Sequence, residues 1–116
     1  MLLDMELKGN ILVVRPEGEL DLTAAETFRK KVDEAMAASG ALHLLIALEK
    51  VEFIDSSGLG AILGRYKQVT DRKGRVALAG ASPAVRRVLE LAGLPRIMKL
   101  YREEKEALRE MAAEAS

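Results

Sequence analysis

The most constraining feature of the sequence is an apolar run from Leu42 to Leu48, in which His43 is the only polar residue. A strand with one wetted face alternates between apolar and polar residues, whereas an almost unbroken apolar run is typical of a strand covered on both faces. Such a strand needs other elements packed above and below it. The run therefore favours a sheet flanked by helices.

Patterns on either side of this run predict the remaining elements. Apolar, β-branched stretches predict strands at 3–8, 11–14, 42–54, 76–79 and 97–100. Apolar residues three and four positions apart predict helices at 23–40, 57–73, 83–92 and 103–113, the last being a charged terminal helix. Strands that alternate with helices favour a single α/β domain over residues 1–116, with a small mixed sheet flanked by about four helices.

Composition excludes several classes of function. Eighteen Lys and Arg balance eighteen Asp and Glu in 116 residues, so the formal net charge is zero and no basic surface for nucleic acid or an anionic membrane is expected. The absence of cysteine excludes disulfides and Cys-ligated metals. No apolar run approaches the ~20 residues of a membrane span and no signal peptide is visible, so we expect a cytoplasmic protein.

Several residues receive structural interpretations. Thr23 and Glu26 fit a capping box at the start of the first helix. His43 is the sole histidine and has no evident second ligand or base, so we interpret it as a strand-start residue with its ring near the surface. Arg65 and Lys67 are interpreted as an exposed helical face.

The junction after Ile54 concentrates the chemistry of the chain, because a strand ends there and a helix begins within three residues. The first amides of a helix lack partners within the helix, and the helix dipole adds partial positive charge at the same point. Ser56 or Ser57 can cap this end, while Gly58 and Gly60 are expected to leave it bare for the approach of another molecule.

Three interpretations of these serines compete. In the first, they only cap the helix. In the second, one serine is the nucleophile of a hydrolase, for which His43 at the far end of the preceding strand is the one available base. In the third, one serine accepts a phosphate, which a helix N-terminus tolerates because its amides and dipole favour an anion.

Five segments together resemble one known family. They are FIDSSGLG at 53–60, AILGRYKQ at 61–68, GELD at 18–21, SPAVRR at 82–87 and GL at 93–94. In this order they closely resemble the anti-sigma factor antagonists of the STAS domain family, and most closely the sporulation branch, the anti-sigma-F factor antagonists. The resemblance spans essentially the whole chain and implies a small mixed sheet flanked by helices.

The resemblance implies a switch and not an enzyme. The unphosphorylated antagonist binds an anti-sigma factor that is also an ATP-dependent serine kinase, and this displaces the sigma factor. The kinase phosphorylates the antagonist and releases it, and a PP2C-type, metal-dependent phosphatase resets it. No cofactor or metal is implied for the antagonist itself, and it is expected to be a monomer when free.

The resemblance also assigns roles to residues. The phosphoacceptor is the serine directly after the aspartate, which is Ser56 here. Glu19 and Asp21 are expected in a loop beside that serine, with Asp21 meeting a basic residue of the anti-sigma factor. Asp55 either fixes the loop and orients the serine or is a solvated turn carboxylate. Further candidate contacts with the partner are Ser57, Gly58, Leu59 and Gly60, with Leu59 and Ile62 being core or contact residues.

Two alternatives stay open. In the first, the chain is an antagonist for another sigma factor, such as a general stress regulator, with the same acceptor chemistry and a different partner. Otherwise it is a nucleotide-binding module whose helix N-terminus at Ser56 holds a phosphate of free GTP or ATP, although no Gly-Lys-Ser/Thr pattern of a P-loop is present.

Overall fold

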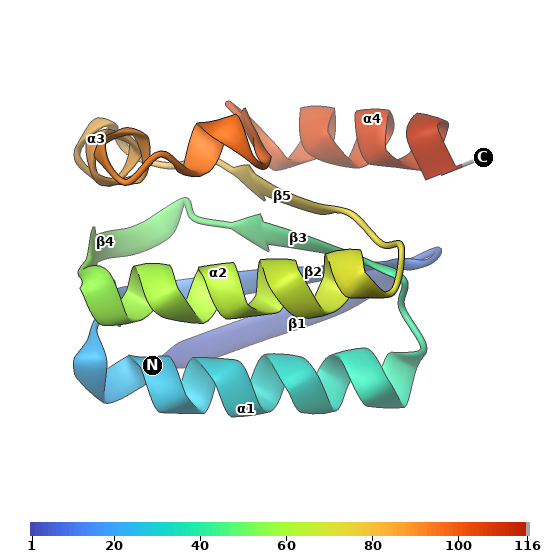
Figure 1. Cartoon of the computed structure of the whole chain (residues 1–116), viewed down its shortest axis with the longest axis horizontal. Coiled ribbons are helices and arrows are strands. Elements are labelled where there is room, and N and C mark those ends of the chain that lie inside the picture. The colour runs from blue at the N-terminus through green and yellow to red at the C-terminus, as the bar shows by residue number, and fades with distance from the viewer. Residues whose placement is uncertain (116) are drawn as a thin grey trace.

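The computed structural model describes residues 1–115 and folds them into a six-stranded sheet with helices on both faces (Figure 1). The elements in chain order are β1 (Leu2–Lys8), β2 (Ile11–Leu20), α1 (Leu22–Ser39), β3 (His43–Ala47), β4 (Lys50–Ile54), α2 (Ser56–Asp71), β5 (Val76–Ala79), α3 (Pro83–Leu91), the 3₁₀ turn η1 (Leu94–Arg96), β6 (Lys99–Tyr101) and α4 (Glu104–Ala115).

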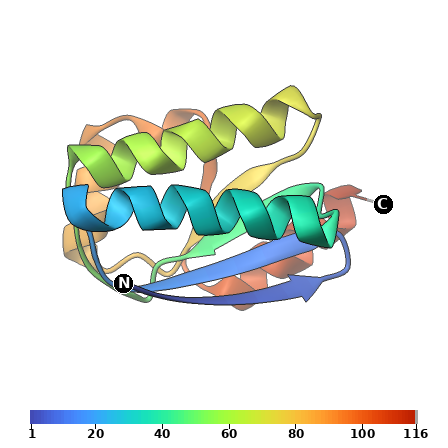
Figure 2. The same ribbon diagram turned by 90° about the horizontal axis from the view of Figure 1, so that it is seen from below.

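The sheet is mixed, as the sequence predicts. Its order is β1-β2-β3-β5-β6, with β1 antiparallel to β2 and the other pairs parallel. α1 and α2 lie side by side on one face with their N-termini at the same end (Figure 2). The larger apolar core lies on this face and also includes residues of α3, whereas a smaller core on the opposite face is closed by Ala107 and Met111 of α4.

The apolar run that opened the sequence analysis forms β3, and every residue of this strand is buried. The prediction of one strand from Leu42 to Ile54 is wrong, because the chain turns after Leu48 and starts a new strand, β4. β2 continues past the end of β3, and β4 pairs in parallel with this free half, from Glu17↔Lys50 to Leu20↔Ile54.

β2 also runs further than predicted. The sequence pattern placed its end near Val14, before Pro16 and Gly18, yet the strand continues to Leu20. Gly18 has a φ of 108°, a conformation that residues with a side chain rarely adopt, and the register between β2 and β4 shifts between Gly18 and Glu19. This bulge lets one strand serve both β3 and β4.

The start of α1 differs from the predicted capping box. Asp21 is the N-cap, and its Oδ1 accepts a hydrogen bond from the Ala24 amide at 3.1 Å, whereas Thr23 lies exposed inside the first turn. α3 is capped by Ser82, whose Oγ accepts from the Val85 amide at 3.2 Å. No helix within residues 1–115 is long and apolar enough to cross a membrane.

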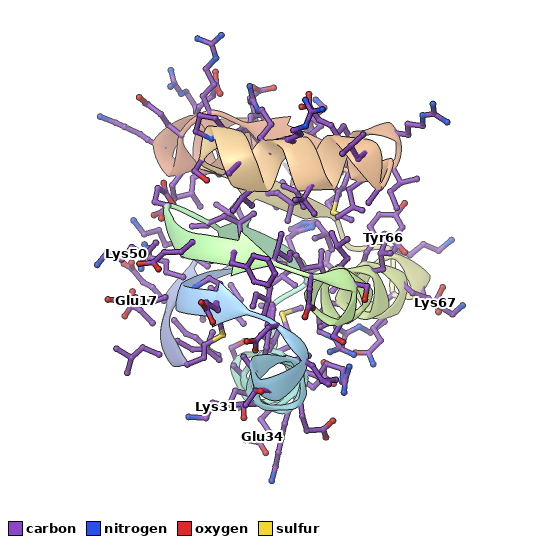
Figure 3. All side chains as sticks on the ribbon, turned by 90° about the vertical axis from the view of Figure 1, so that its left-hand side faces the viewer. Glu17, Lys31, Glu34, Lys50, Tyr66 and Lys67 are labelled. Carbon is purple, nitrogen blue, oxygen red and sulfur yellow. The ribbon has the colours of Figure 1, made fainter. Side chains whose placement is uncertain are left out.

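Arg65 does not belong to the predicted exposed face of α2. Lys67 points outward (Figure 3), but Arg65 is buried between α2 and α1, where its Nε lies 3.0 Å from Asp33 Oδ1. Burial lowers the pKa of this guanidinium, and the Asp33 carboxylate opposes that effect. Arg65 therefore joins the two helices that begin at the candidate site.

The ring of His43 is buried rather than near the surface. Its Nδ1 accepts a hydrogen bond from the Arg75 amide at 3.0 Å, which requires the imidazole to be neutral at that nitrogen. Burial lowers the pKa of His43, and the nearby Arg75 charge lowers it further. The residue thus has a structural role at the start of β3.

The depressed pKa of His43 predicts acid sensitivity. Between the folded pKa and the unfolded value near 6.5, the unfolded chain binds more protons than the folded one. The free energy of unfolding therefore falls as the pH drops through this window, whereas above about pH 6.5 the contribution of neutral His43 is fully present. Urea unfolding between pH 7.5 and 5.5 checks this. His43→Gln keeps an acceptor but does not titrate, so its stability should vary less with pH; an equal pH dependence in both proteins would contradict the prediction.

Candidate functional site

The candidate site forms where β2 and β4 end side by side. Glu19 pairs with Phe53 and Leu20 with Ile54, and the Asp55 amide donates to the Leu20 carbonyl at 3.4 Å. The GELD and FIDSSG segments, more than thirty residues apart in sequence, therefore lie next to each other, as the resemblance implied. Each strand leads directly into a helix, α1 after β2 and α2 after β4.

Two aspartates cap these neighbouring helices with nearly identical backbones. Asp21 has φ −114° and ψ −170°, and Asp55 has φ −113° and ψ −172°. Both helices are seen end-on from this side in Figure 3. The site is thus a pair of adjacent helix N-termini, each already occupied by a carboxylate.

Asp55 binds both segments of the site. Its Oδ1 accepts from the Ser57 amide at 2.9 Å and the Gly58 amide at 3.1 Å, and its Oδ2 accepts from the Leu22 amide of α1 at 3.2 Å. The prediction that Ser56 or Ser57 caps α2 is therefore wrong. Of the two interpretations of Asp55, the solvated turn carboxylate does not hold, because the half-buried side chain fixes the loop.

Ser56 is the first residue of α2, and it is exposed, whereas Ser57 is half-buried. Ser56 follows directly on the Asp55 cap, so its hydroxyl has no capping role to lose on modification. Among the two serines, the exposed one is the more accessible acceptor for another molecule.

The two glycines after these serines have different surroundings. Gly60 is exposed, and a Cβ built there has open space around it. Gly58 is buried, and a Cβ there would overlap the Leu20 carbonyl oxygen and lie 2.9 Å from Ile54. Gly58 therefore lets α2 pack on the β2 backbone and does not form part of a bare external face, contrary to the sequence-based expectation.

The apolar residues of this turn face mostly inward. Leu59 is half-buried and packs against the main core, and Ile62 is fully buried within it. Ile62 is therefore a core residue, whereas Leu59 lies between the core and the surface and retains some area for a contact.

Two exposed apolar side chains beside Ser56 were missed by the sequence reasoning. Leu22, whose amide is bound by Asp55, is 74% exposed, and Phe53 of β4 is 50% exposed. No signal was present for Leu22, because it stands three residues before the buried Ala25 and so fits the helical spacing of the apolar face of α1. Exposed apolar groups next to a polar site are typical of a protein-binding surface.

The site is acidic although the whole chain is neutral. Residues 17–21 and 49–55 contain six carboxylates and one basic side chain, namely Glu17, Glu19, Asp21, Glu49, Glu52, Asp55 and Lys50. Figure 3 shows Glu17 and Lys50 on the same side of the molecule. We call this surface, with Leu22, Phe53 and Ser56, the acidic face. The carboxylates of the two segments outnumber their one lysine by five, and such an excess favours a basic partner surface.

The geometry does not supply catalytic groups to Ser56. His43 begins β3, at the other end of the sheet, and its Nδ1 already accepts a hydrogen bond. Within residues 1–115, no group of three or more His, Asp or Glu side chains could hold a metal ion. The hydrolase interpretation therefore receives no support from the arrangement of side chains.

Comparisons with known proteins agree with this fold and site. The model of the STAS domain matches residues 3–107. The chain belongs to the STAS domain family. It is 39% identical over 109 residues to the anti-sigma F factor antagonist of Paenibacillus polymyxa, covering 94% of this chain and 93% of the relative. The resemblance on which the sequence analysis relied is thus confirmed, and the chain groups with the anti-sigma factor antagonists of the family.

The comparisons extend to two solved structures and one further relative. The structure of the anti-sigma factor antagonist SpoIIAA in its unphosphorylated form matches with a TM-score of 0.83 and 32% identity, over 97% of both chains. SpoIIAA of Bacillus in its phosphorylated form matches with a TM-score of 0.74 and 32% identity, over 94% of this chain and 98% of that one. The anti-sigma-B factor antagonist of Bacillus subtilis is 32% identical, over 84% of this chain and 87% of the relative.

Proposed function

We propose that this protein is an anti-sigma-F factor antagonist that phosphorylation of Ser56 switches off. The unphosphorylated form binds an anti-sigma factor with serine kinase activity and so frees the sigma factor for sporulation transcription. A PP2C-type phosphatase restores this form. The observation that carries the proposal is the place of Ser56, exposed on the acidic face and held between two capped helix starts.

The relatives support phosphorylation as the modification that controls the protein. SpoIIAA is known in a phosphorylated and an unphosphorylated form, and both share this fold at 32% identity. In the proposed reaction the Ser56 hydroxyl oxygen forms a bond to the γ-phosphorus of ATP, the bond to the β–γ bridging oxygen breaks, and ADP leaves. The hydroxyl proton passes to a base on the kinase. The serine gains about −1.5 to −2 charges near neutral pH.

The proposed partner surface is the acidic face. Leu22 and Phe53 supply apolar area, and Glu19 is exposed beside them. Asp21 Oδ1 is bound to the Ala24 amide, so we propose that its other oxygen meets the basic residue of the anti-sigma factor. Ser57, Leu59 and Gly60 are proposed to contribute contacts at the rim; Gly58 supports them from below. The free protein is proposed to be a cytoplasmic monomer that binds neither nucleic acid nor a membrane.

One alternative keeps specific support. Identity to the anti-sigma-B factor antagonist of Bacillus subtilis is 32%, so a different sigma factor pathway with the same acceptor chemistry is the second candidate function. The nucleotide-binding alternative is weakened, because Asp55 already occupies two amides of α2 that a free nucleotide phosphate would require.

Incubation with the cognate anti-sigma kinase and ATP should add one phosphate, at Ser56. Mass spectrometry of the intact protein and its peptides measures this, and Ser56→Ala should remain unmodified while Ser57→Ala is phosphorylated normally. A phosphate on Ser57 or Ser82, or full phosphorylation of Ser56→Ala, would rule out the assignment. Pull-downs with candidate anti-sigma factors and ADP or ATP would identify the sigma factor pathway.

A further inference from the structure

We infer that Asp55 is the positioning residue of the switch, because its carboxylate occupies the α2 N-terminus and thereby forces the Ser56 phosphate outward. The inference rests on the proposed function, in which Ser56 is the phosphoacceptor. Without such a carboxylate, a phosphate on the first residue of a helix would fold back onto the free amides and lose its effect on a partner.

The hydrogen bonds of α2 support this assignment. Oδ1 of Asp55 takes the Ser57 and Gly58 amides, and the Asp55 carbonyl oxygen accepts from the Leu59 amide at 2.9 Å. These bonds leave the amide of Ser56 itself as the remaining donor of the first turn. A phosphate on Ser56 therefore meets a carboxylate where other helix N-termini offer a ring of donors.

The second oxygen of Asp55 links the start of α2 to the start of α1. Oδ2 holds the Leu22 amide at 3.2 Å, so the α1 start and the α2 start move together as one surface. A phosphate that displaced Asp55 would break bonds in both segments. The loop therefore has reason to keep its shape on phosphorylation, and the added charge stands on the surface beside Leu22.

The neighbouring cap offers a matched comparison. Asp21 caps α1 with nearly the same backbone angles, but the residue that follows it is Leu22, which carries no acceptor oxygen. Loss of Asp21 removes one capping bond and loss of Asp55 removes three, so each variant is compared with its own phosphorylated form. Only loss of Asp55 should change the surroundings of a phosphate on Ser56.

The test uses the full chain with phosphoserine placed at position 56 during translation, so that no kinase is required. The second pKa of the phosphate, ordinarily near 6, is measured by ³¹P NMR. We expect a value above 6 in the wild-type background, since a like charge adjoins it, and a decrease of at least about half a unit in Asp55→Asn. In Asp55→Ala the freed amides should bring the value below 6.

Asp21→Ala is the control and should leave the phosphate pKa close to the wild-type value. The other charged side chains of the acidic face, which are Glu17, Glu19, Glu49, Lys50 and Glu52, are unchanged in all variants. Phosphate should also raise the thermal midpoint of Asp55→Ala and not that of Asp21→Ala, because it replaces the missing cap in the first variant alone.

A wild-type phosphate pKa below 6, or one value shared by all variants, would overturn the inference. Equal thermal shifts on phosphorylation of Asp55→Ala and Asp21→Ala would do the same. In a further outcome, the phosphate pKa values follow the expected order, with wild type highest and Asp55→Ala lowest, while the kinase does not phosphorylate Ser56. That outcome would overturn the proposed function and leave the role of Asp55 intact.

Discussion

Gly58→Ala should lower the free energy of unfolding by about 2–4 kcal/mol, while Gly60→Ala, two residues further along α2, should raise it by about 0.5–1 kcal/mol. The new Cβ at Gly58 would overlap the Leu20 carbonyl oxygen, and neither that backbone atom nor the packed Ile54 side chain can move freely. The Cβ at Gly60 has open space, so only the gain in helix propensity remains.

The opposite signs make this pair informative. Both glycines lie within α2, where alanine is intrinsically favoured by up to about 1 kcal/mol, so propensity alone predicts stabilisation at both positions. Urea unfolding of the two variants, at a pH above 7 where His43 is neutral in the folded and unfolded states, measures the difference. A Gly58→Ala protein as stable as the wild type would show that α2 does not pack on β2 as described.

The substitution Gly58→Ala should also affect phosphorylation of Ser56. Gly58 donates to Asp55, and its close contact with Leu20 fixes the distance between α2 and the end of β2. A shift of α2 would therefore loosen the Asp55 bond and change how Ser56 is presented. We expect residual folded Gly58→Ala to be a poorer kinase substrate than Gly60→Ala.

Periodicity was sufficient to predict most of the fold. Apolar runs located the strands and residues three and four apart located the helices, because burial imposes these spacings on any sequence. The division of 42–54 into β3 and β4 could not be predicted, since it depends on β2 outrunning β3 and offering a second edge. Pairing between distant segments leaves no local trace in the chain.

The candidate site was predicted in part. The strand-to-helix junction after Ile54 and the resemblance of the GELD segment located it, but the capping residues were misassigned because Asp, Ser and Thr all cap helices and backbone geometry decides between them. His43 and Arg65 were placed at the surface because polar residues are usually exposed, yet both side chains are buried. Phe53 falls within the predicted strand 42–54, and only its exposed position on β4 makes it part of the acidic face.

Phosphorylation of Ser56 should weaken binding to the ADP-loaded anti-sigma factor about 100-fold. Two unit charges ~4 Å apart interact by about 4 kcal/mol at an effective dielectric near 20, and about 3 kcal/mol corresponds to two decades in affinity. Titration calorimetry with Ser56→Asp and Ser56→Asn separates charge from size. Asp should lose most of the affinity and Asn distinctly less; equal losses would remove the electrostatic explanation.

Because the partner of an acidic face is expected to be basic, the repulsion must act between the Ser56 phosphate and a nearby group of the partner, and not between the two proteins as a whole. An acidic face attracts a basic partner, so extra negative charge elsewhere on the chain should leave association unchanged or slightly faster. Lys67→Asp provides the control, because its exposed side chain lies three turns along α2 and its charge change of −2 equals that of a phosphate. If Lys67→Asp weakened binding as much as phosphoserine, release would depend on total charge. If it does not, release depends on the position of the phosphate at Ser56, as repulsion by a carboxylate or nucleotide phosphate of the partner directly opposite Ser56 requires.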